Sequence, residues 1–266
     1  MGEFISKNND NSIYFDTITK DAFKKLKALD AKLPAYTFKY LGRKNSSIAY
    51  YDTPENLLQR TGILLYKTCI DGKHYFNLSK QPFLPNAFRK SEEKVFVHEI
   101  SQRDTPKDHA LYLVDAISSM FTTQFRIDLE NVLKTARPKL IIEIKAETYK
   151  VFGGTGFKCD LDMQNVLYNN LETKRKVKRK EVAFKLDSST AFQKDYDLFI
   201  KTITKYCKDI AEMREPRDVY ALNLTKQLDK TGKKDKIVAK KKEKQRRPED
   251  IIEGWCFLSP QARNLQ

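Results

Sequence analysis

The sequence predicts an α+β fold in which a mainly antiparallel sheet is combined with several helices. Three observations predict it: strand-like segments in which polar and apolar residues alternate, the dipeptide Asp71-Gly72 between two of them, and three segments with helical periodicity. An Asp-Gly pair is a strong signal for a tight hairpin between antiparallel strands. With 266 residues, 40% of them hydrophobic, the chain can bury a core around such a sheet.

The first half of the chain is expected to hold a strand, a helix and then an antiparallel meander. Residues 12–18 have the composition of a short strand, and the apolar residues from Ala22 to Leu29 recur at helical spacing until Pro34 ends the helix. Further strands are expected at 36–41, 46–51, 62–70 and 74–80.

The second half is expected to cross the sheet with a helix and to add further strands. The expected elements are a strand at 88–98, a helix at 107–125, strands at 139–151, 157–168 and 181–187, and a closing helix between Tyr196 and Ile210. In the strand 139–151, period two places Glu143, Lys145 and Glu147 on one face. The regular pattern fades near residue 223.

The net charge of +15 is concentrated near the C-terminus. Residues 226–247 contain eleven Lys or Arg against three acids, and this Lys-rich, apolar-poor composition cannot support a core. Such a charge implies attraction to polyanions. The predicted organisation is a flexible N-terminus at 1–11, one folded domain at 12–223, a flexible basic arm at 224–250 and an apolar docking segment at 251–266.

Charged residues that alternate along a strand have two interpretations. An antiparallel sheet that is exposed on one side usually carries mixed charges there, so the pattern is commonly a solvated surface. Several such strands together can instead close into a barrel with a polar interior, which forms a tunnel for a charged ligand.

The segment YYDTPENLLQRTGILLYK (50–67), followed by Gly72 and the strand HYFNLSK (74–80), resembles the signature of the CYTH family in the triphosphate tunnel metalloenzyme superfamily. The turn FKCDLD (157–162) and the order of elements are also similar, over roughly residues 12–223. This resemblance implies an antiparallel, eight-stranded, tunnel-like barrel with flanking helices, here followed by the basic C-terminal arm.

The resemblance also implies which residues bind phosphate and metal. Cations of the tunnel bind the phosphates of a triphosphate, polyphosphate or nucleotide, and carboxylates hold Mg²⁺ or Mn²⁺. The implied phosphate-binding residues are Lys67, Lys80, Lys90, Lys145, Lys158 and Lys185. The implied metal ligands are Glu92, Asp162 and Glu181, and no catalytic residue is assigned.

The sequence departs from the family pattern at several carboxylates. The first strand has Ser12, Tyr14 and Asp16 at alternate positions, where the family has Glu-x-Glu-x-Lys. Ala183 stands where the last strand should carry a second glutamate, and an Arg-x-Arg pair is represented by Lys67 alone. Loss of metal-holding carboxylates should weaken or remove catalysis, while the cations could still bind phosphate.

Two functions therefore remain open. One is a binding or assembly protein that holds a phosphate-rich polyanion, such as a nucleotide, an RNA end or polyphosphate, through its fold and its basic arm. The alternative is an active metal-dependent triphosphatase, or a related phosphoryl-transfer enzyme, that acts on a nucleoside triphosphate, an RNA 5′-triphosphate or polyphosphate.

Two basic segments are candidates for nucleic-acid binding. The run KRKVKRK (174–180) is either a phosphate-binding segment or a solvated loop between two barrel strands. Disordered Lys-rich arms such as 226–247 commonly bind polyanions. The candidate residues are Lys174, Arg175, Lys176, Lys178, Arg179, Lys180, Lys240, Lys241, Lys242, Arg246 and Arg247.

The remaining features concern compartment and partners. The four cysteines are widely spaced without a CxxC pair, which disfavours a zinc site and a disulfide framework and fits an intracellular, reduced setting. A soluble protein is expected, because no run of about 18 apolar residues exists. The apolar segment IIEGWCFLSP (251–260) is expected to contact a protein partner.

Overall fold

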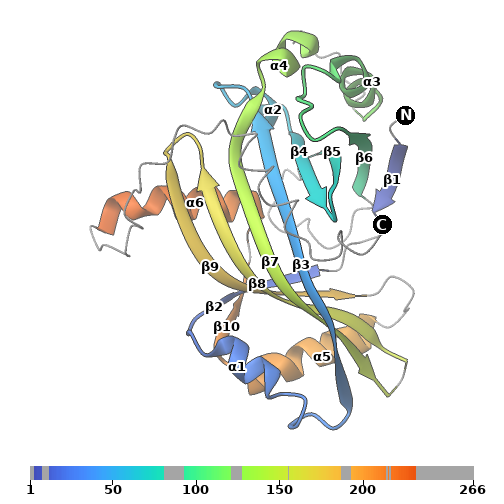
Figure 1. Cartoon of the computed structure of the whole chain (residues 1–266), viewed down its shortest axis with the longest axis vertical. Helices are drawn as coiled ribbons and strands as arrows, with labels where there is room; N and C mark the ends of the chain where they lie inside the picture. Colours follow the sequence, from blue (N-terminus) through green and yellow to red (C-terminus); the bar gives the residue numbers. More distant parts are fainter. Residues whose placement is uncertain are drawn as a thin grey trace, which may run out of the picture.

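The computed structural model describes residues 3–7, 12–80, 93–120, 128–154, 156–186, 193–213, 215 and 217–231. These residues form one sheet of ten strands in the order β1-β6-β5-β4-β3-β7-β8-β9-β2-β10, with every neighbouring pair antiparallel (Figure 1). The strands are β1 (Glu3–Lys7), β2 (Ser12–Thr17), β3 (Tyr36–Asp52), β4 (Ile63–Ile70), β5 (Lys73–Lys80), β6 (Glu93–Ile100), β7 (Arg137–Gly153), β8 (Lys158–Asn170), β9 (Arg175–Leu186) and β10 (Ile210–Glu212).

Helices cover the sheet in three places, each with its own hydrophobic cluster. The helices are α1 (Ala22–Lys27), α2 (Leu57–Arg60), α3 (Ala110–Met120), α4 (Leu129–Thr135), α5 (Gln193–Tyr206) and α6 (Arg217–Thr231). One cluster joins α1 and α5 to β2, β8 and β9, and a second joins α3 and α4 to β4, β5 and β6. The third cluster lies between α6 and the strands β7 and β8.

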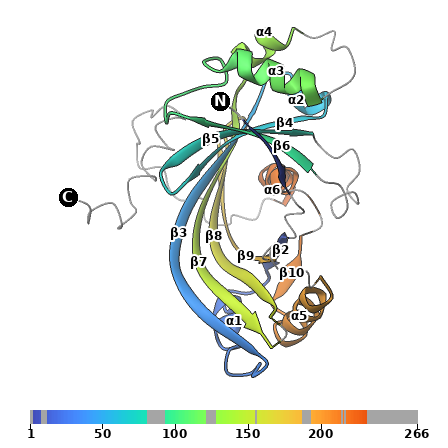
Figure 2. The ribbon, with the colours of Figure 1, turned by 90° about the vertical axis from the view of Figure 1, so that its right-hand side faces the viewer.

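The two faces of the central strands have different neighbours. The strands β3, β7 and β8 are bowed, and α6 lies on the inner side of the bend beneath β4–β6 (Figure 2). Along β7, Ile142 and Ile144 share a cluster with Ala221 of α6, whereas Ile141 and Val151 belong to the clusters of the other helices. Because side chains alternate along a strand, we call these the α6 face and the opposite face.

Two local features follow directly from the sequence. Asp71 and Gly72 have positive φ values of 50° and 80°, as a two-residue hairpin turn requires, so the predicted turn between β4 and β5 is confirmed. The expected strands 36–41 and 46–51 are one strand, β3, whose pairing with β7 shifts register between Tyr40 and Gly42. Gly42 permits this irregularity with a φ of 131°.

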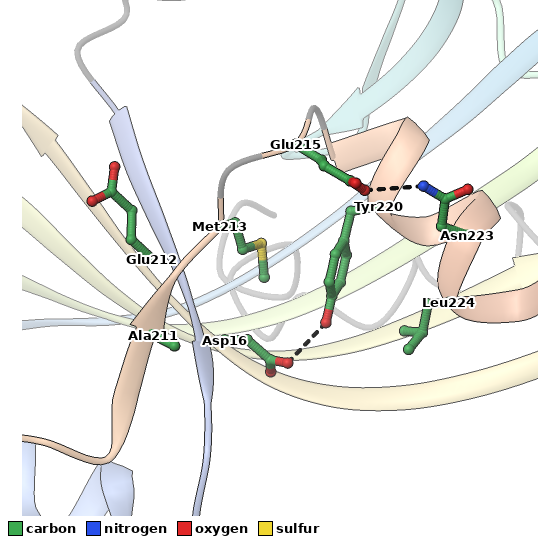
Figure 3. A pocket seen from close by; sticks show the side chains of 8 residues that line it. All are labelled: Asp16, Ala211, Glu212, Met213, Glu215, Tyr220, Asn223 and Leu224. Atoms are coloured by element: carbon green, nitrogen blue, oxygen red, sulfur yellow. Dashed lines mark hydrogen bonds between the residues drawn. The ribbon is translucent and has the colours of Figure 1, made fainter. Parts of the chain in front are cut away.

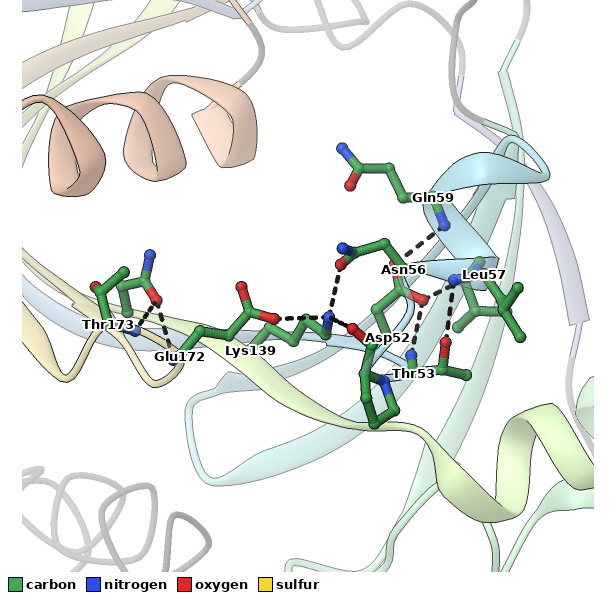
Figure 4. A network of polar contacts seen from close by, with 11 residues as sticks. Asp52, Thr53, Asn56, Leu57, Gln59, Lys139, Glu172 and Thr173 are labelled. Carbon is green, nitrogen blue, oxygen red and sulfur yellow. Dashed lines mark hydrogen bonds and ion pairs between the residues drawn. The ribbon is translucent and has the colours of Figure 1, made fainter.

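The block of sequence that carries the family resemblance has a structural role here. The Asp52 carboxylate accepts hydrogen bonds from the backbone N–H groups of Thr53, Leu58 and Gln59, at 2.7, 2.8 and 3.1 Å (Figure 4). It therefore satisfies donors at the beginning of α2 that would otherwise lack partners. The Asp-Thr-Pro sequence thus fixes the turn between β3 and β4.

The lysine beside this turn connects it to the β8–β9 turn. Lys139 lies 2.6 Å from Asn56 Oδ1 and 2.7 Å from the Glu172 carboxylate (Figure 4). Asn170 in turn accepts from the backbone N–H groups of Glu172 and Thr173. This polar network surrounds a pocket of only about 80 Å³ and fixes two loops against each other.

The α+β, antiparallel fold predicted from the sequence is confirmed, with differences in its extent. Residues 3–7, expected to be flexible, pair as β1 with β6, and α6 continues to Thr231 through the beginning of the predicted arm. The helix α4 was not predicted. Ten strands replace the expected eight, and the edge strands β1 and β10 do not pair with each other in the described residues, so the sheet there is open.

The buried thiols agree only in part with the expected reduced state. Cys159 and Cys207 are free and buried, and burial raises the pKa of both thiols. Cys69, in contrast, is disulfide-bonded.

Within the described ranges, the helices are too short or too polar to cross a membrane.

Candidate functional site

The most buried charge of the predicted site is the Glu181 carboxylate on β9. Glu181 is completely buried on the α6 face, and both of its oxygens have protein partners. Oε1 accepts a hydrogen bond from the Tyr168 hydroxyl of β8, and Oε2 lies 2.7 Å from Arg217 Nη2 at the beginning of α6. A residue predicted to hold metal is therefore bound by a phenol and a guanidinium.

Arg217 connects α6 to three strands. Its Nη2 also donates to Gln164 Oε1 on β8 at 2.8 Å, and its guanidinium lies 5.2 Å from the centre of the Tyr14 ring on β2. Gln164 and Glu181 are directly paired across β8 and β9, which explains why one guanidinium reaches both. Arg217 is thus held by a carboxylate, an amide oxygen and an aromatic face.

Burial dominates the electrostatics of this pair. Loss of hydration raises the pKa of Glu181, while Arg217 and the Tyr168 hydroxyl act in the opposite direction by stabilising the carboxylate. Burial also disfavours the charge of Arg217, but Glu181 and Tyr168 raise the pKa of the guanidinium above its ordinary value. Glu181 is completely buried and the Arg217 side chain is only 11% exposed, so each charge depends mainly on the other for its stabilisation.

The second predicted metal ligand, Asp162, is neutralised in a similar way. Its Oδ1 accepts from the Thr148 hydroxyl at 2.7 Å, and its Oδ2 lies 3.3 Å from Lys185 Nζ. Asp162 and Lys185 share the α6 face with Glu181. Asp162 is two residues from Gln164, which is paired with Glu181, and Lys185 is four residues from Glu181 on the same strand. The structure therefore brings Asp162, Glu181 and Lys185, which the resemblance implied as site residues, to one face of the sheet.

These carboxylates do not fit a divalent ion. Each of the four oxygens of Asp162 and Glu181 already has a donor, and two of those donors carry a positive charge. Nor do the described residues contain any group of three His, Cys, Asp or Glu side chains placed to hold a metal. Mg²⁺ or Mn²⁺ would have to displace Arg217 and Lys185 from their partners.

Other predicted phosphate-binding residues do not converge with these three. Lys67 is buried on the opposite face, where its ammonium donates to the carbonyl oxygens of Gln102 and Asp104. Lys145 is exposed on the opposite face, and Lys158 is exposed at the beginning of β8. Lys80 ends β5, where it is paired with Ile63. Lys90 and the predicted metal ligand Glu92 lie outside the described residues.

The basic run 174–180 is a turn and a strand rather than a loop. Lys174 occupies the β8–β9 turn with a φ of 54°, and β9 begins at Arg175. Alternation then divides the run, because Arg175, Val177 and Arg179 lie on the α6 face and Lys176, Lys178 and Lys180 on the opposite face. All three lysines are exposed, and Arg175 Nη1 donates to the Thr225 carbonyl of α6 at 3.2 Å.

Lys145 of β7 lies on the same face as these three lysines. Lys145 is paired with Asn165 of β8, and Asn165 is paired with Lys180 of β9, so the three side chains form a row across the sheet. Glu143, the next residue of β7 on this face, is buried. Burial raises the pKa of its carboxyl group, and the charges of Lys176 and Lys145 oppose that shift.

A pocket of about 350 Å³ lies between β10 and α6, and it is acidic. Asp16, Glu212 and Glu215 line it, and Figure 3 shows the Tyr220 hydroxyl pointing at the Asp16 carboxylate, to which it donates at 2.8 Å. Asn223 donates to Glu215 at 3.0 Å. Three carboxylates repel phosphate, so this pocket is unsuited to the predicted ligand.

Sequence reasoning missed the residues that occupy the centre of the α6 face. Arg217 belongs to EPRDVYAL (215–222), just before the regular pattern fades, and Tyr168 and Gln164 lie on a strand in which only the charged residues were singled out. A lone arginine next to apolar helical residues was the available signal. The arm candidates Lys240, Lys241, Lys242, Arg246 and Arg247, and the segment 251–260, lie outside the described residues.

Comparison with solved structures gives distant matches over most of the chain. A putative adenylyl cyclase from Hippeastrum, described as having a dominant triphosphatase activity, is 10% identical with a TM-score of 0.46, covering 80% of this chain and 95% of that one. A putative adenylate cyclase from Bacillus halodurans is 14% identical with a TM-score of 0.41, covering 75% and 92%. The S. pombe Pct1 RNA triphosphatase, solved in complex with the Spt5 CTD, is 11% identical with a TM-score of 0.32, covering 73% and 69%.

Two of these three structures are described as putative adenylyl or adenylate cyclases and the third as an RNA triphosphatase. No family model and no curated protein matches the sequence. With identities of 10–14% and TM-scores below 0.5, function has to be argued from the side chains of this chain itself.

Proposed function

We propose that this chain binds a phosphate-rich polyanion without hydrolysing it, and that it has a binding or assembly role. The polyanion is a nucleic acid, a nucleotide or polyphosphate, recognised by the exposed lysines of the sheet and by the part of the predicted basic arm (224–250) that follows α6. The net charge of +15 supports this class of partner. The apolar segment 251–260 remains the proposed contact for a protein partner.

One observation carries the non-catalytic part of the proposal. The Glu181 carboxylate is buried and is bound by Arg217 and Tyr168, so this predicted metal ligand is already neutralised by the protein. Phosphoryl-transfer enzymes depend on metal ions to neutralise the charge that develops during the reaction. A carboxylate that is paired with an arginine does not supply that ion's coordination.

A binding measurement tests the polyanion part. The full chain and a variant with Lys240, Lys241, Lys242, Arg246 and Arg247 changed to Gln are titrated into labelled RNA, DNA and polyphosphate at several salt concentrations. We expect the wild-type affinity to fall steeply with salt, and the variant to bind more weakly with a smaller slope. Equal affinities and slopes would exclude the arm, and no binding by the wild type would overturn the proposal.

A phosphate-release assay tests the non-catalytic part. Wild type, Glu181→Gln and Asp162→Asn are incubated with Mg²⁺ or Mn²⁺ and with nucleoside triphosphate, 5′-triphosphorylated RNA or tripolyphosphate. We expect the same background release from all three proteins. Release by the wild type that both substitutions remove would establish the alternative, a metal-dependent triphosphatase.

A further inference from the structure

We propose that Lys145, Lys176, Lys178 and Lys180 form one docking surface on the opposite face of the sheet, which we call the lysine face, and that it holds the phosphodiester backbone of duplex nucleic acid. This inference rests on the proposed function and names its site and its ligand. It joins a residue predicted for a phosphate tunnel with residues predicted for nucleic acid, which the sequence had placed in separate sites.

The sheet gives the backbone positions of the four lysines a regular arrangement. Residues two apart on an antiparallel strand are separated by about 6.8 Å, so Lys176, Lys178 and Lys180 extend over about 14 Å along β9. Lys145 lies two strands away in the same row as Lys180, at a separation of about 10 Å. Each strand of a duplex presents one phosphate per about 3.4 Å of helix axis, so such a surface can face several phosphates at once.

The same run of sequence has its remaining cations turned away from this surface. Arg175 donates to the Thr225 carbonyl of α6, and Arg179 lies on the α6 face together with Val177. The sequence predicted a binding segment with six cations, but only three of them, Lys176, Lys178 and Lys180, lie on the lysine face. The other three are a turn residue, Lys174, and two arginines beside α6.

The residues between the lysines indicate what kind of nucleic acid fits. Proteins that bind single strands place aromatic side chains where bases can stack. On β8, the residues that separate Lys145 from the lysines of β9 are Asn165 and the half-buried Leu167, neither of which is aromatic. An exposed amide between ammonium groups suits contacts with phosphate and sugar, so duplex is favoured over single strands and recognition is independent of base sequence.

The lysine face lies between the helices that pack on this side of the sheet, which leaves it accessible to a ligand. The helices α1 and α5 pack on the opposite face at one end of the central strands, and Ile141 belongs to the cluster of α3 and α4 at the other end. Between these two clusters the side chains of Lys145, Lys178 and Lys180 are exposed. Lys180 is also positioned by the Phe23 ring, 5.2 Å from its ammonium group.

Neighbouring residues on β9 provide a matched test. Lys178→Gln and Arg179→Gln each remove one positive charge from adjacent positions, but only Lys178 lies on the lysine face. In the full chain, we expect Lys178→Gln to reduce the slope of log K against log salt for duplex binding by about 0.9, and Lys145→Gln/Lys178→Gln by about 1.8. Arg179→Gln should change that slope by much less.

The outcomes separate this inference from the proposed function. Equal losses in Lys178→Gln and Arg179→Gln would show that only net charge matters and would overturn the lysine face while leaving polyanion binding intact. A wild type that binds neither duplex nor single strands would overturn both. Tighter binding of single-stranded RNA or DNA than of duplex would contradict the proposal that the ligand is a duplex. Unchanged unfolding midpoints in Lys178→Gln and Arg179→Gln would show that the comparison reports on binding alone.

Discussion

Arg217 at the beginning of α6 lies 2.7 Å from the buried carboxylate of Glu181 on β9. The two residues are 36 positions apart in the sequence, and their contact fixes α6 to the inner side of the bowed sheet. Where the family resemblance implied a metal ligand, the protein has an internal ion pair with a phenol as its third member. The pair therefore determines both the packing of α6 and the chemistry that Glu181 can support.

Breaking this pair should destabilise the fold. Arg217→Met leaves Glu181 buried without its cation, and removal of one partner from a buried ion pair costs about 3–5 kcal/mol. We expect a fall of that size in the free energy of unfolding in urea. The double variant Arg217→Met/Glu181→Leu should recover most of the loss, because no unpaired charge remains; a loss below about 1 kcal/mol in the single variant would contradict a buried pair.

The two tyrosine hydroxyls offer a comparison between a buried and a more accessible hydrogen bond. Tyr168→Phe removes a donor from the buried Glu181, whereas Tyr220→Phe removes a donor from Asp16 at the edge of the acidic pocket. Hydrogen bonds to charged groups contribute about 1.5–3 kcal/mol. We expect the free energy of unfolding to fall more for Tyr168→Phe than for Tyr220→Phe; the reverse order would show that Glu181 does not depend on the phenol.

The Asp52 carboxylate should matter for stability and not for ligand binding. Asp52→Ala leaves three backbone N–H groups around α2 without their acceptor, and unsatisfied buried donors cost about 1–3 kcal/mol each. Asp52→Asn keeps one acceptor oxygen and should lose less. If Asp52→Asn retained full stability but lost polyanion affinity, the Asp-Thr-Pro turn would belong to the binding site after all.

Glu143 should give the protein a pH-dependent stability and affinity. Its pKa is raised by burial, so its contribution to stability is complete below the ordinary glutamate pKa and is lost as the pH rises through the raised value. Glu143→Gln should therefore gain stability relative to wild type as the pH increases over this interval. It should also bind duplex more tightly near neutral pH, since it removes a negative charge beside Lys145 and Lys176.

The raised pKa of Glu143 predicts that wild type and Glu143→Gln differ by an amount that changes with pH. If their differences in unfolding free energy and in duplex affinity stayed constant from pH 4 to pH 8, this prediction would be wrong. The measurements are urea unfolding and duplex titration across the pH series, with Lys145→Gln as a control that alters the same surface without removing a carboxylate.

Much of the sheet could be predicted from the sequence because its signals are local. The Asp71-Gly72 turn requires positive φ values that those residues accept readily, and the alternation in β7 fixes which residues share a face. The beginning of β9 was missed because three of its residues on one face are lysines, while on the other face only Val177 is apolar between two arginines. Such a strand is stabilised by its pairing with β8 and not by its own pattern.

The site was harder to predict because it depends on long-range packing. Glu181 and Lys185 share a face through their spacing within β9, whereas Asp162 joins them only through the pairing of β8 with β9. What neutralises Glu181 could not be read, because Arg217 reaches it only after α6 has folded onto the inner side of the bend. Likewise, Lys145 and Lys178 become neighbours through the register of three strands, which no local pattern contains.

The claim that Arg217 and Tyr168 take the place of a metal ion at Glu181 is tested most directly by the binding of manganese. One equivalent of Mn²⁺ is added to the full chain, without phosphate, and the free ion is measured from its electron paramagnetic resonance signal. We expect the signal to equal that of Mn²⁺ in buffer, for wild type and for Glu181→Gln alike. Stoichiometric loss of the signal with the wild type, restored in Glu181→Gln, would show that the carboxylate serves a metal ion instead of Arg217.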